Sequence, residues 1–388
     1  MLLARLMSAS GLRDVVRADA EEARERTVRR WFFIVLAATA VGLTLQRGFE
    51  AHHTTFPIFR QSFHHLVEGR DLYAAYPAEQ GGEPQDRFKY SPTAALLFAP
   101  FAIWSIPVGL LLWNLFNAFA LAKVLDRLLP RPDSTIALWL TYPALFHSMQ
   151  SSSSNGVMAA IIIGAFLLIE GGRLTAGAIA VATGALFKIF PIAAAAFALF
   201  QPRRWRFASV LAAALVIGLA LPLLVTPPET LLAQFQSWRG MLSSDAGDLL
   251  FGDSVMRLAR AALRERFENW PMQMFGAAML MLPVALRPHQ WHERKFRELF
   301  LCSVLVFVVI FNHQAEHPSF VIAAAGVAIW FVQSRLTVVR VVVLGLCLAS
   351  IEPLGYALAW LLMQMDLYGL KMPRLETTTS EYERVLNN

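Results

Sequence analysis

The sequence predicts an all-α, polytopic integral membrane protein, a helical bundle of about 10–13 transmembrane or re-entrant helices. Three observations lead to this fold class: an apolar composition, long segments without charge, and basic residues gathered between those segments. Hydrophobic residues make up 56% of the 388 residues and charged residues only 16%, whereas soluble domains contain about 25% charged residues. This composition excludes an ordinary soluble globular domain.

Segments without Lys, Arg, Asp or Glu recur from residue 31 to residue 365. Several exceed the roughly 20 residues that a helix needs to cross the hydrocarbon core. Pro100 and Pro107 interrupt one of them and Pro191 another, which predicts short or re-entrant pieces beside full spans. The segments are 31–46, 91–122, 134–169, 174–187, 189–202, 207–228, 269–286, 299–312, 318–334, 341–351 and 353–365.

Basic residues between the spans predict the orientation of the chain. Arg29 and Arg30 precede the first span, which places the N-terminus in the cytoplasm by the positive-inside rule. The later basic clusters then face the cytoplasm, and the polar segments face outward. We therefore expect a protein of the cytoplasmic membrane with a site on its outer face, and the net charge of +6 requires no nucleic-acid partner. The cytoplasmic clusters are Lys123, Arg127 and Arg131; Arg173; Arg203, Arg204 and Arg206; Arg287, Arg294, Lys295 and Arg297; and Arg335 and Arg340.

The spans are expected to form one membrane domain, 31–366, that carries two outer loops, 47–91 and 226–270. The preceding segment, 1–30, is interpreted either as an amphipathic helix on the cytoplasmic bilayer surface or as a solvated tail. Residues 367–388 are expected to form a C-terminal tail.

Polar residues at membrane depth are costly, so each is a candidate for function. Lys188 follows one apolar segment and precedes a helix break, where a cation would suit a phosphate or pyrophosphate. The alternative interpretation is that the Lys188 side chain only extends its charge to the polar membrane interface. Gln150 and Asn155 flank a serine run between two spans; they are candidates for binding sugar or phosphate, or else helix caps and contacts between helices.

A polar turn separates two late apolar segments. Asn312, His313, Glu316 and His317 lie in it, and it is interpreted either as a substrate-binding turn or as a hydrated loop. The letters H-x-x-E-H also occur there, but a zinc-protease site needs an uninterrupted helix and Pro318 follows at once. We expect no metal site.

The first outer loop carries a further group of polar side chains. Arg60 is a candidate for gripping phosphate, and Glu68 or Asp71 for deprotonating an acceptor hydroxyl. Lys89 and Tyr90 lie at the end of the loop, where a soluble head group and a donor in the bilayer would meet. Surface ion pairing is the alternative for each of these residues.

Several of these motifs, in this order, resemble glycosyltransferase family 87. The resemblance covers residues from about 50 to 335 and includes Trp113 and Asn114 together with Gln150, Asn155 and Lys188. The motifs are Thr-Phe-Pro-Ile-Phe-Arg at 55–60, Glu-Gly-Arg-Asp-Leu-Tyr at 68–73, Phe-Lys-Tyr-Ser-Pro at 88–92, Lys-Ile-Phe-Pro at 188–191 and Glu-His-Pro-Ser at 316–319.

The resemblance implies a GT-C-like fold and an inverting hexosyltransferase. Such an enzyme moves a mannose-like hexose from a polyprenyl-phosphate donor in the membrane to a glycan or glycolipid acceptor of the cell envelope, with no cofactor. Lys188 and Arg60 would hold phosphate, and the substrate pocket would be lined by Lys89, Tyr90, Gln150, Asn155, Asn312, His313 and His317.

One position departs from the family pattern. An acidic residue, the presumed base, usually precedes the Phe-x-x-Phe motif, and Thr55 stands there instead. A threonine hydroxyl cannot act as this base unaided, so Asp71, Glu68 or Glu316 is expected to replace it. Two alternatives stay open: a transporter or flippase of lipid-linked sugars, and an inactive relative that acts as a binding partner.

Overall fold

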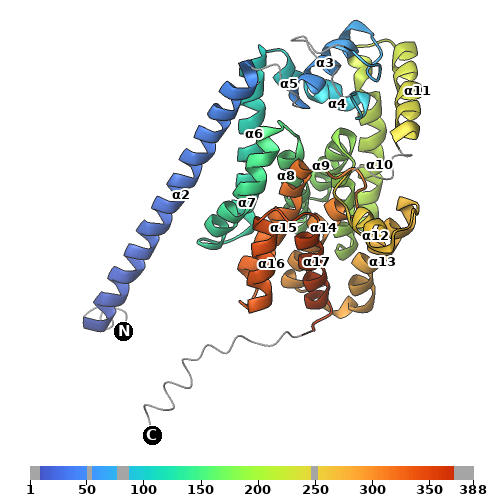
Figure 1. Cartoon of the computed structure of the whole chain (residues 1–388). Coiled ribbons are helices and arrows are strands. Elements are labelled where there is room, and N and C mark those ends of the chain that lie inside the picture. Colours follow the sequence, from blue (N-terminus) through green and yellow to red (C-terminus); the bar gives the residue numbers. More distant parts are fainter. Residues whose placement is uncertain (1–8, 50–54, 77–86, 246–251, 371–388) are drawn as a thin grey trace.

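The computed structural model describes residues 9–49, 55–76, 87–245 and 252–370. Within these ranges the regular structure is entirely helical, which confirms the predicted all-α class (Figure 1). The elements are α2 (Ala9–Phe49), α3 (Thr55–Glu68), α4 (Pro92–Leu97), α5 (Ala99–Ala102), α6 (Ile106–Leu128), α7 (Asp133–Gln150), α8 (Asn155–Glu170), α9 (Leu174–Phe187), the 3-10 helix η1 (Phe190–Phe200), α10 (Arg204–Ala220), η2 (Leu221–Leu224), α11 (Pro228–Asp245), α12 (Val255–Leu263), α13 (Asn269–Leu286), η3 (Pro288–Gln290), α14 (Arg294–Ile310), η4 (His317–Ser319), α15 (Phe320–Gln333), α16 (Val338–Leu348) and α17 (Leu354–Leu367).

Three helical segments of the described chain are long and apolar enough to cross a membrane: Asp19–Arg47, Ile106–Leu128 and Arg204–Leu224. Further apolar helices of 10–17 residues lie among them. The helical membrane bundle is therefore confirmed, while many of its apolar helices are shorter than a full straight span. The proline-containing segments explain part of this shortening, since a proline ends or interrupts a regular helix.

The long helix α2 runs without interruption through residue 30, where the sequence predicted a boundary between the N-terminal segment and the first span. It packs against α6 and α7 and extends away from the bundle at its N-terminal end (Figure 1). Phe32 contacts the ring of Trp139 at 5.3 Å, and the Thr39 and Tyr142 hydroxyls lie 2.6 Å apart. Trp31 is 58% exposed and therefore available to lipid.

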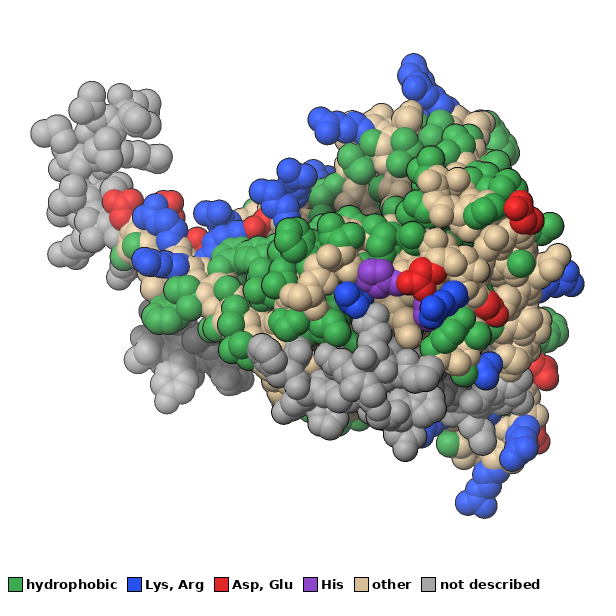
Figure 2. All heavy atoms as spheres, turned by 90° about the horizontal axis from the view of Figure 1, so that it is seen from above, with side chains coloured by type: hydrophobic (Ala, Val, Ile, Leu, Met, Phe, Trp, Pro, Cys, Tyr) green, Lys and Arg blue, Asp and Glu red, His purple; other side chains and the backbone are tan. Residues whose placement is uncertain are grey.

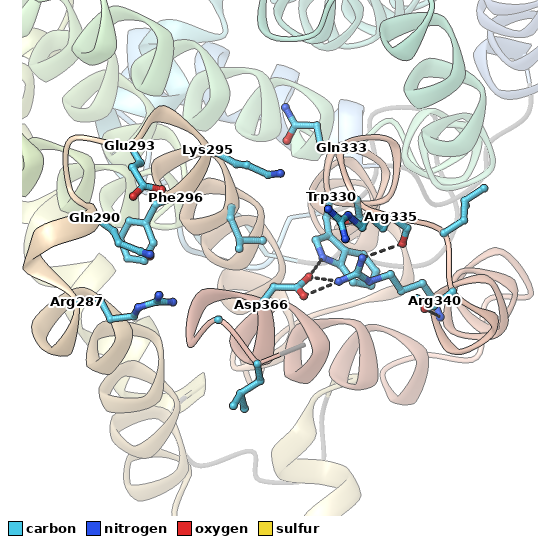
Figure 3. Close-up of a pocket in the computed structure, with 16 residues that line it drawn as sticks. Arg287, Gln290, Glu293, Lys295, Phe296, Trp330, Gln333, Arg335, Arg340 and Asp366 are labelled. Carbon is cyan, nitrogen blue, oxygen red and sulfur yellow. Dashed lines mark hydrogen bonds and ion pairs between the residues drawn. The ribbon is translucent and has the colours of Figure 1, made fainter. Parts of the chain in front are cut away.

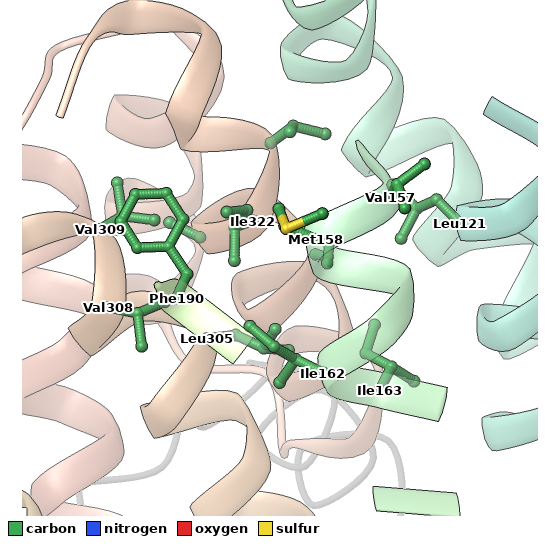
Figure 4. Packing of buried hydrophobic residues seen from close by; sticks show 14 of the residues in the cluster. Leu121, Val157, Met158, Ile162, Ile163, Phe190, Leu305, Val308, Val309 and Ile322 are labelled. Carbon is green, nitrogen blue, oxygen red and sulfur yellow. The ribbon is translucent and has the colours of Figure 1, made fainter. Parts of the chain in front are cut away.

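The core lies where α6, α8, η1, α14 and α15 meet (Figure 4). Met158 and Ile162 of α8 pack there beside Leu305 of α14 and Ile322 of α15, all fully buried. A helix that is apolar on every side is stable only when protein or lipid surrounds it. By contrast, α10 leaves Val216 67% exposed, as expected for a helix that faces lipid.

Prolines divide two apolar segments in the way that the sequence predicts. Pro92 and Pro100 lie in the first turns of the short helices α4 and α5, and Pro107 in that of α6. In the second segment α9 ends at Phe187, and Pro191 lies in the first turn of η1. Each interruption leaves polar backbone and side chains among apolar helices, which is tolerated in a membrane only where protein or water covers them.

Basic segments meet at the end of the bundle opposite α3, where several ion pairs fasten the helices. Arg29 of α2 pairs with Asp126 of α6, and Arg297 makes two hydrogen bonds of 2.7 Å to Glu170 at the end of α8. Phe200 contacts Trp291 in the same region at 5.7 Å. The Arg297–Glu170 pair thus brings the predicted cytoplasmic cluster at 287–297 close to Arg173.

Candidate functional site

The ammonium group of Lys188 lies at the break between α9 and η1. The backbone of Lys188 is extended, with φ −152° and ψ 139°, because the helix ends and Pro191 starts the next one. Its Nζ donates a hydrogen bond of 2.9 Å to Oδ1 of Asn155. The same atom lies 5.7 Å from the ring centre of Tyr90 and 5.0 Å from that of Phe190, in the range of cation–π attraction.

Gly184 permits the close approach of α9 to η1 that places Lys188. A Cβ atom at this position would lie 2.7 Å from Cβ of Pro191 and 2.8 Å from Ile161. Such contacts are too short for any side chain, so the two helices would have to separate. The lysine position therefore depends on a glycine one turn earlier in α9.

The serine turn between α7 and α8 orients Asn155. Its Nδ2 lies 3.2 Å from Oγ of Ser153, to which it donates, and this hydroxyl also lies 2.8 Å from that of Ser148. Because the amide nitrogen is used in this way, the amide oxygen is directed to Lys188. Asn155 is 2% exposed, so the contact is enclosed by the protein.

Thr55 begins α3 and lies against the same serine turn. Its hydroxyl is 3.1 Å from the carbonyl oxygen of Ser151 and 2.9 Å from that of Ser152. The Ser152 carbonyl also accepts a bond of 2.8 Å from the indole of Trp113, and Ser152 has a positive φ of 53°. The position where the family pattern expects a base is thus occupied by a donor that fastens α3 to the turn.

Through η4, the turn 312–319 packs on α7, the helix that leads into the serine turn. Asn312 accepts a hydrogen bond of 3.2 Å from the backbone of Gln314, so its side chain closes the turn. Gly252, with φ +83°, fits against the His313 carbonyl, which a Cβ would approach to 2.3 Å. Glu316 is exposed, and its charge acts on the ammonium of Lys188.

His317 and Glu352 form a close pair beside this turn. Nδ1 of His317 lies 2.6 Å from Oε2 of Glu352, and the His317 ring contacts that of His147 edge-on at 4.3 Å. Glu352 lies in the turn between α16 and α17 with 7% of its side chain exposed. Burial raises the pKa of Glu352 to about 8, and the nearby charge of Asp253 acts in the same direction. Burial and the neighbouring His147 lower the pKa of His317 below its usual value, so near neutral pH the pair favours a protonated Glu352 beside a neutral His317.

The sequence reasoning missed Glu352, Asp253 and His147. Glu352 could have been found, because it is the charge that separates the apolar segments 341–351 and 353–365. Asp253 and His147 gave no such signal. Asp253 reaches the site because its backbone N–H donates to the Ala315 carbonyl at 2.6 Å.

Two predicted bases of the first outer loop make other contacts. Glu68 pairs with Arg70 at 3.0 Å, and both side chains are at least half exposed. Asp71 accepts hydrogen bonds from the backbone of Tyr73 and from the hydroxyl of Ser237, which joins the loop to α11. Among the three predicted bases, Glu316 is close enough for its charge to act on the ammonium of Lys188.

The remaining predicted residues lie on several elements. Tyr90 stacks on Phe59 with ring centres 4.9 Å apart and borders Lys188, while the Lys89 carbonyl accepts from Trp238 at 3.2 Å. Nε of Arg60 donates to the Trp104 carbonyl at 3.4 Å. Gln150 is the last residue of α7 and is partly exposed.

Seen from the α3 end, the surface has wide hydrophobic areas, with histidine, acidic and basic side chains together near the middle (Figure 2). Within the described ranges, no group of three His, Cys, Asp or Glu residues has the arrangement of a metal site. The arrangement offers a cation, amide groups, a carboxylate and a histidine–glutamate pair. These groups can bind an anion and a polyhydroxylated ligand and can accept a proton.

The comparisons with known proteins identify a family. The model of glycosyltransferase family 87 matches residues 88–311, more than half of the chain. The match includes Tyr90, Asn155 and Lys188 and ends just before Asn312. The comparison with curated proteins found no match.

Proposed function

The chain belongs to glycosyltransferase family 87, and from this membership we propose the reaction of a membrane hexosyltransferase. The donor is a polyprenyl-phosphate hexose, mannose-like, and the acceptor is a glycan or glycolipid of the cell envelope. Transfer takes place at the outer face of the cytoplasmic membrane and needs no cofactor. The observation that carries this proposal is the Lys188–Asn155 contact at a helix break between apolar helices.

Lys188 binds the phosphate of the donor. An ammonium group has three N–H donors, and the bond to Asn155 uses one of them, so two remain for phosphate oxygens. The aromatic rings of Tyr90 and Phe190 lie beside the ammonium and offer apolar surface to the first isoprenoid unit. A cation among aromatic side chains is suited to a ligand whose charged head continues into a hydrocarbon chain.

His317 accepts the proton of the attacking hydroxyl, supported by Glu352. When Glu352 is ionised, Nδ1–H of His317 donates to it, and Nε2 then carries the free lone pair. The deprotonated acceptor oxygen attacks the anomeric carbon from the side opposite the phosphate. The bond from that carbon to the phosphate oxygen breaks, polyprenyl phosphate leaves with the electron pair, and the configuration is inverted.

Glu316, in electrostatic range of Lys188, accepts hydrogen bonds from hydroxyls of the transferred sugar. This role differs from that of the base, because it contributes to donor binding. The histidine–glutamate pair contributes to the chemical step. Kinetics of the variants Glu316→Gln and Glu352→Gln separate the two roles, since the first raises KM for the donor and the second lowers kcat.

The experiment that tests the proposal is transfer of labelled hexose from a polyprenyl-phosphate donor by the purified full chain. We expect transfer by the wild type and a decrease in kcat/KM of at least about tenfold in Lys188→Ala, because a hydrogen bond to a charged group contributes about 1.5–3 kcal/mol. Lys123→Ala, in the basic cluster at the end of α6, is the matched control. Unchanged transfer by Lys188→Ala contradicts the phosphate site.

A further inference from the structure

A cavity of about 580 Å³ lies among α14, α15, α16 and α17, and its lining shares no residue with the site described above (Figure 3). Its walls come from the segment after α13, from α14, from the end of α15, from the start of α16 and from the end of α17. Its volume falls within the roughly 300–1,000 Å³ that is typical of pockets for small ligands. It is therefore large enough for a ligand head group.

Basic side chains outnumber acidic ones in the lining of this cavity. Four basic and two acidic residues line it: Arg287, Lys295, Arg335 and Arg340, and Glu293 and Asp366. In Figure 3, the side chains of Arg287 and Lys295 extend from one wall toward Trp330 on the opposite wall. The lining thus carries net positive charge, which favours an anionic ligand.

The charge of Asp366 is already neutralised by the protein. Arg340 contacts its two carboxylate oxygens at 2.5 and 2.6 Å, and the indole of Trp330 donates to it at 2.8 Å. Nε of Arg340 is buried and has no hydrogen-bond partner within the described ranges. The Lys295 side chain is exposed, and no described residue pairs with it. Arg340 is thus used by Asp366, whereas the exposed side chain of Lys295 remains available to a ligand.

Apolar surface borders the cavity on the side of α16. Leu336 and Leu370 line it and are 64% and 55% exposed. Val338 and Val339, in the first turn of α16, are 54% and 51% exposed and extend this apolar surface along the helix. A ligand in the cavity would thus have basic groups at its head and lipid-facing side chains beside it.

We propose that this cavity binds the phosphate head group of an anionic phospholipid, with Lys295 and Arg335 contacting the phosphate. The acyl chains then lie along the exposed valines of α16. Basic pockets between transmembrane helices bind anionic lipid heads by the same attraction. The inference goes beyond the transfer reaction, because none of the residues that line the cavity belongs to the site around Lys188.

The test is native mass spectrometry of the full chain in detergent during a titration with phosphatidylglycerol. The double variant Lys295→Ala/Arg335→Ala removes two exposed side chains from the cavity, and Arg204→Ala/Arg206→Ala removes two exposed arginines from the start of α10 as a matched control. Each cation near a membrane surface contributes about 1 kcal/mol, which corresponds to a loss of roughly 30-fold in affinity for two. Thermal melting without lipid verifies that both variants fold.

The expected result is one tightly bound phosphatidylglycerol molecule in the wild type and the control, and its loss in the cavity variant. Phosphatidylcholine should bind all three proteins equally. Equal affinity of the wild type and the cavity variant for phosphatidylglycerol overturns the proposal. Displacement of the lipid by millimolar inorganic phosphate would show instead that the cavity takes a soluble anion.

Discussion

The ammonium of Lys188 is hydrogen-bonded to the side-chain oxygen of Asn155 at 2.9 Å, which joins the end of α9 to the start of α8. The lysine is fixed by a helix break and the asparagine by the serine turn. Neither side chain is oriented by its own helix alone. The site of this transferase therefore depends on two interruptions in otherwise apolar helices.

Replacing Asn155 by Asp tests whether Lys188 is available to phosphate. The new carboxylate would form an ion pair with the ammonium and compete with the donor phosphate for it. We expect KM for the polyprenyl-phosphate donor to rise by about tenfold or more, while the free energy of unfolding changes little. Steady-state kinetics at varied donor concentration measure this. Asn269→Asp is the matched control, because Asn269 also accepts a hydrogen bond from a cationic side chain, that of Arg260, at the start of α13; an equal rise in that variant contradicts the interpretation.

Replacing Thr55 by Asp tests the departure from the family pattern. The hydroxyl of Thr55 faces the carbonyl oxygens of Ser151 and Ser152, and a carboxylate there would face the same two acceptors without a proton to donate. We expect a loss of about 1–3 kcal/mol in stability and no gain in transfer activity. Thermal melting and the transfer assay measure the two effects, with Thr55→Ser as the conservative control.

The opposite outcome for Thr55→Asp would change the conclusion. If the variant transfers sugar and the wild type does not, the natural chain is an inactive relative and position 55 is the place of the missing base.

The pH dependence of transfer tests the His317–Glu352 pair. Since burial raises the pKa of Glu352 to about 8, the carboxyl group is protonated below that pH and donates to Nδ1 of His317. Nε2 then carries the proton and cannot accept another. As the pH rises through about 8, Glu352 ionises and Nε2 becomes a base, so kcat should increase.

Glu352→Gln provides the comparison for this profile. The amide of Gln does not ionise in this pH range, so the variant should have a low kcat at every pH and should lack the rise near pH 8. A wild-type kcat that falls between pH 6.5 and 8.5 contradicts the role assigned to the pair.

Gly184→Ala tests the close contact that positions Lys188. Its Cβ would lie 2.7 Å from Pro191, and overpacking of this kind costs about 1–3 kcal/mol. We expect a lower melting temperature and a higher KM for the donor, because the separation of α9 and η1 moves the lysine. Gly345→Ala is the matched control, since a Cβ there meets nothing within 4 Å. Equal melting temperatures of the two variants would contradict the packing argument.

Much of the fold could be predicted from the sequence, because charge-free segments and prolines determine where individual helices begin and end. The prolines at 100, 107 and 191 predicted the short helices and the break after Lys188, which the structure contains. The continuity of α2 through residue 30 was not predicted, because the change from charged to apolar residues suggested a boundary there. A helix can continue across such a change when no proline or glycine interrupts it.

The candidate site could be predicted only in part. The cost of burying polar and charged groups identified Lys188 and Asn155 as candidates, and the structure brings these two together. Glu68 and Asp71 could not be assigned, because their partners, Arg70 and Ser237, depend on loop geometry. Long-range contacts of this kind leave no periodic pattern in the sequence.

The most direct test of the central claim is the affinity of the purified chain for polyprenyl phosphate without its sugar. Lys188→Met keeps the length of the side chain and removes its charge, and Lys123→Met is the control. We predict that Lys188→Met weakens binding by at least about tenfold while the control equals the wild type. Equal affinity of all three proteins would contradict the claim that Lys188 binds the donor phosphate.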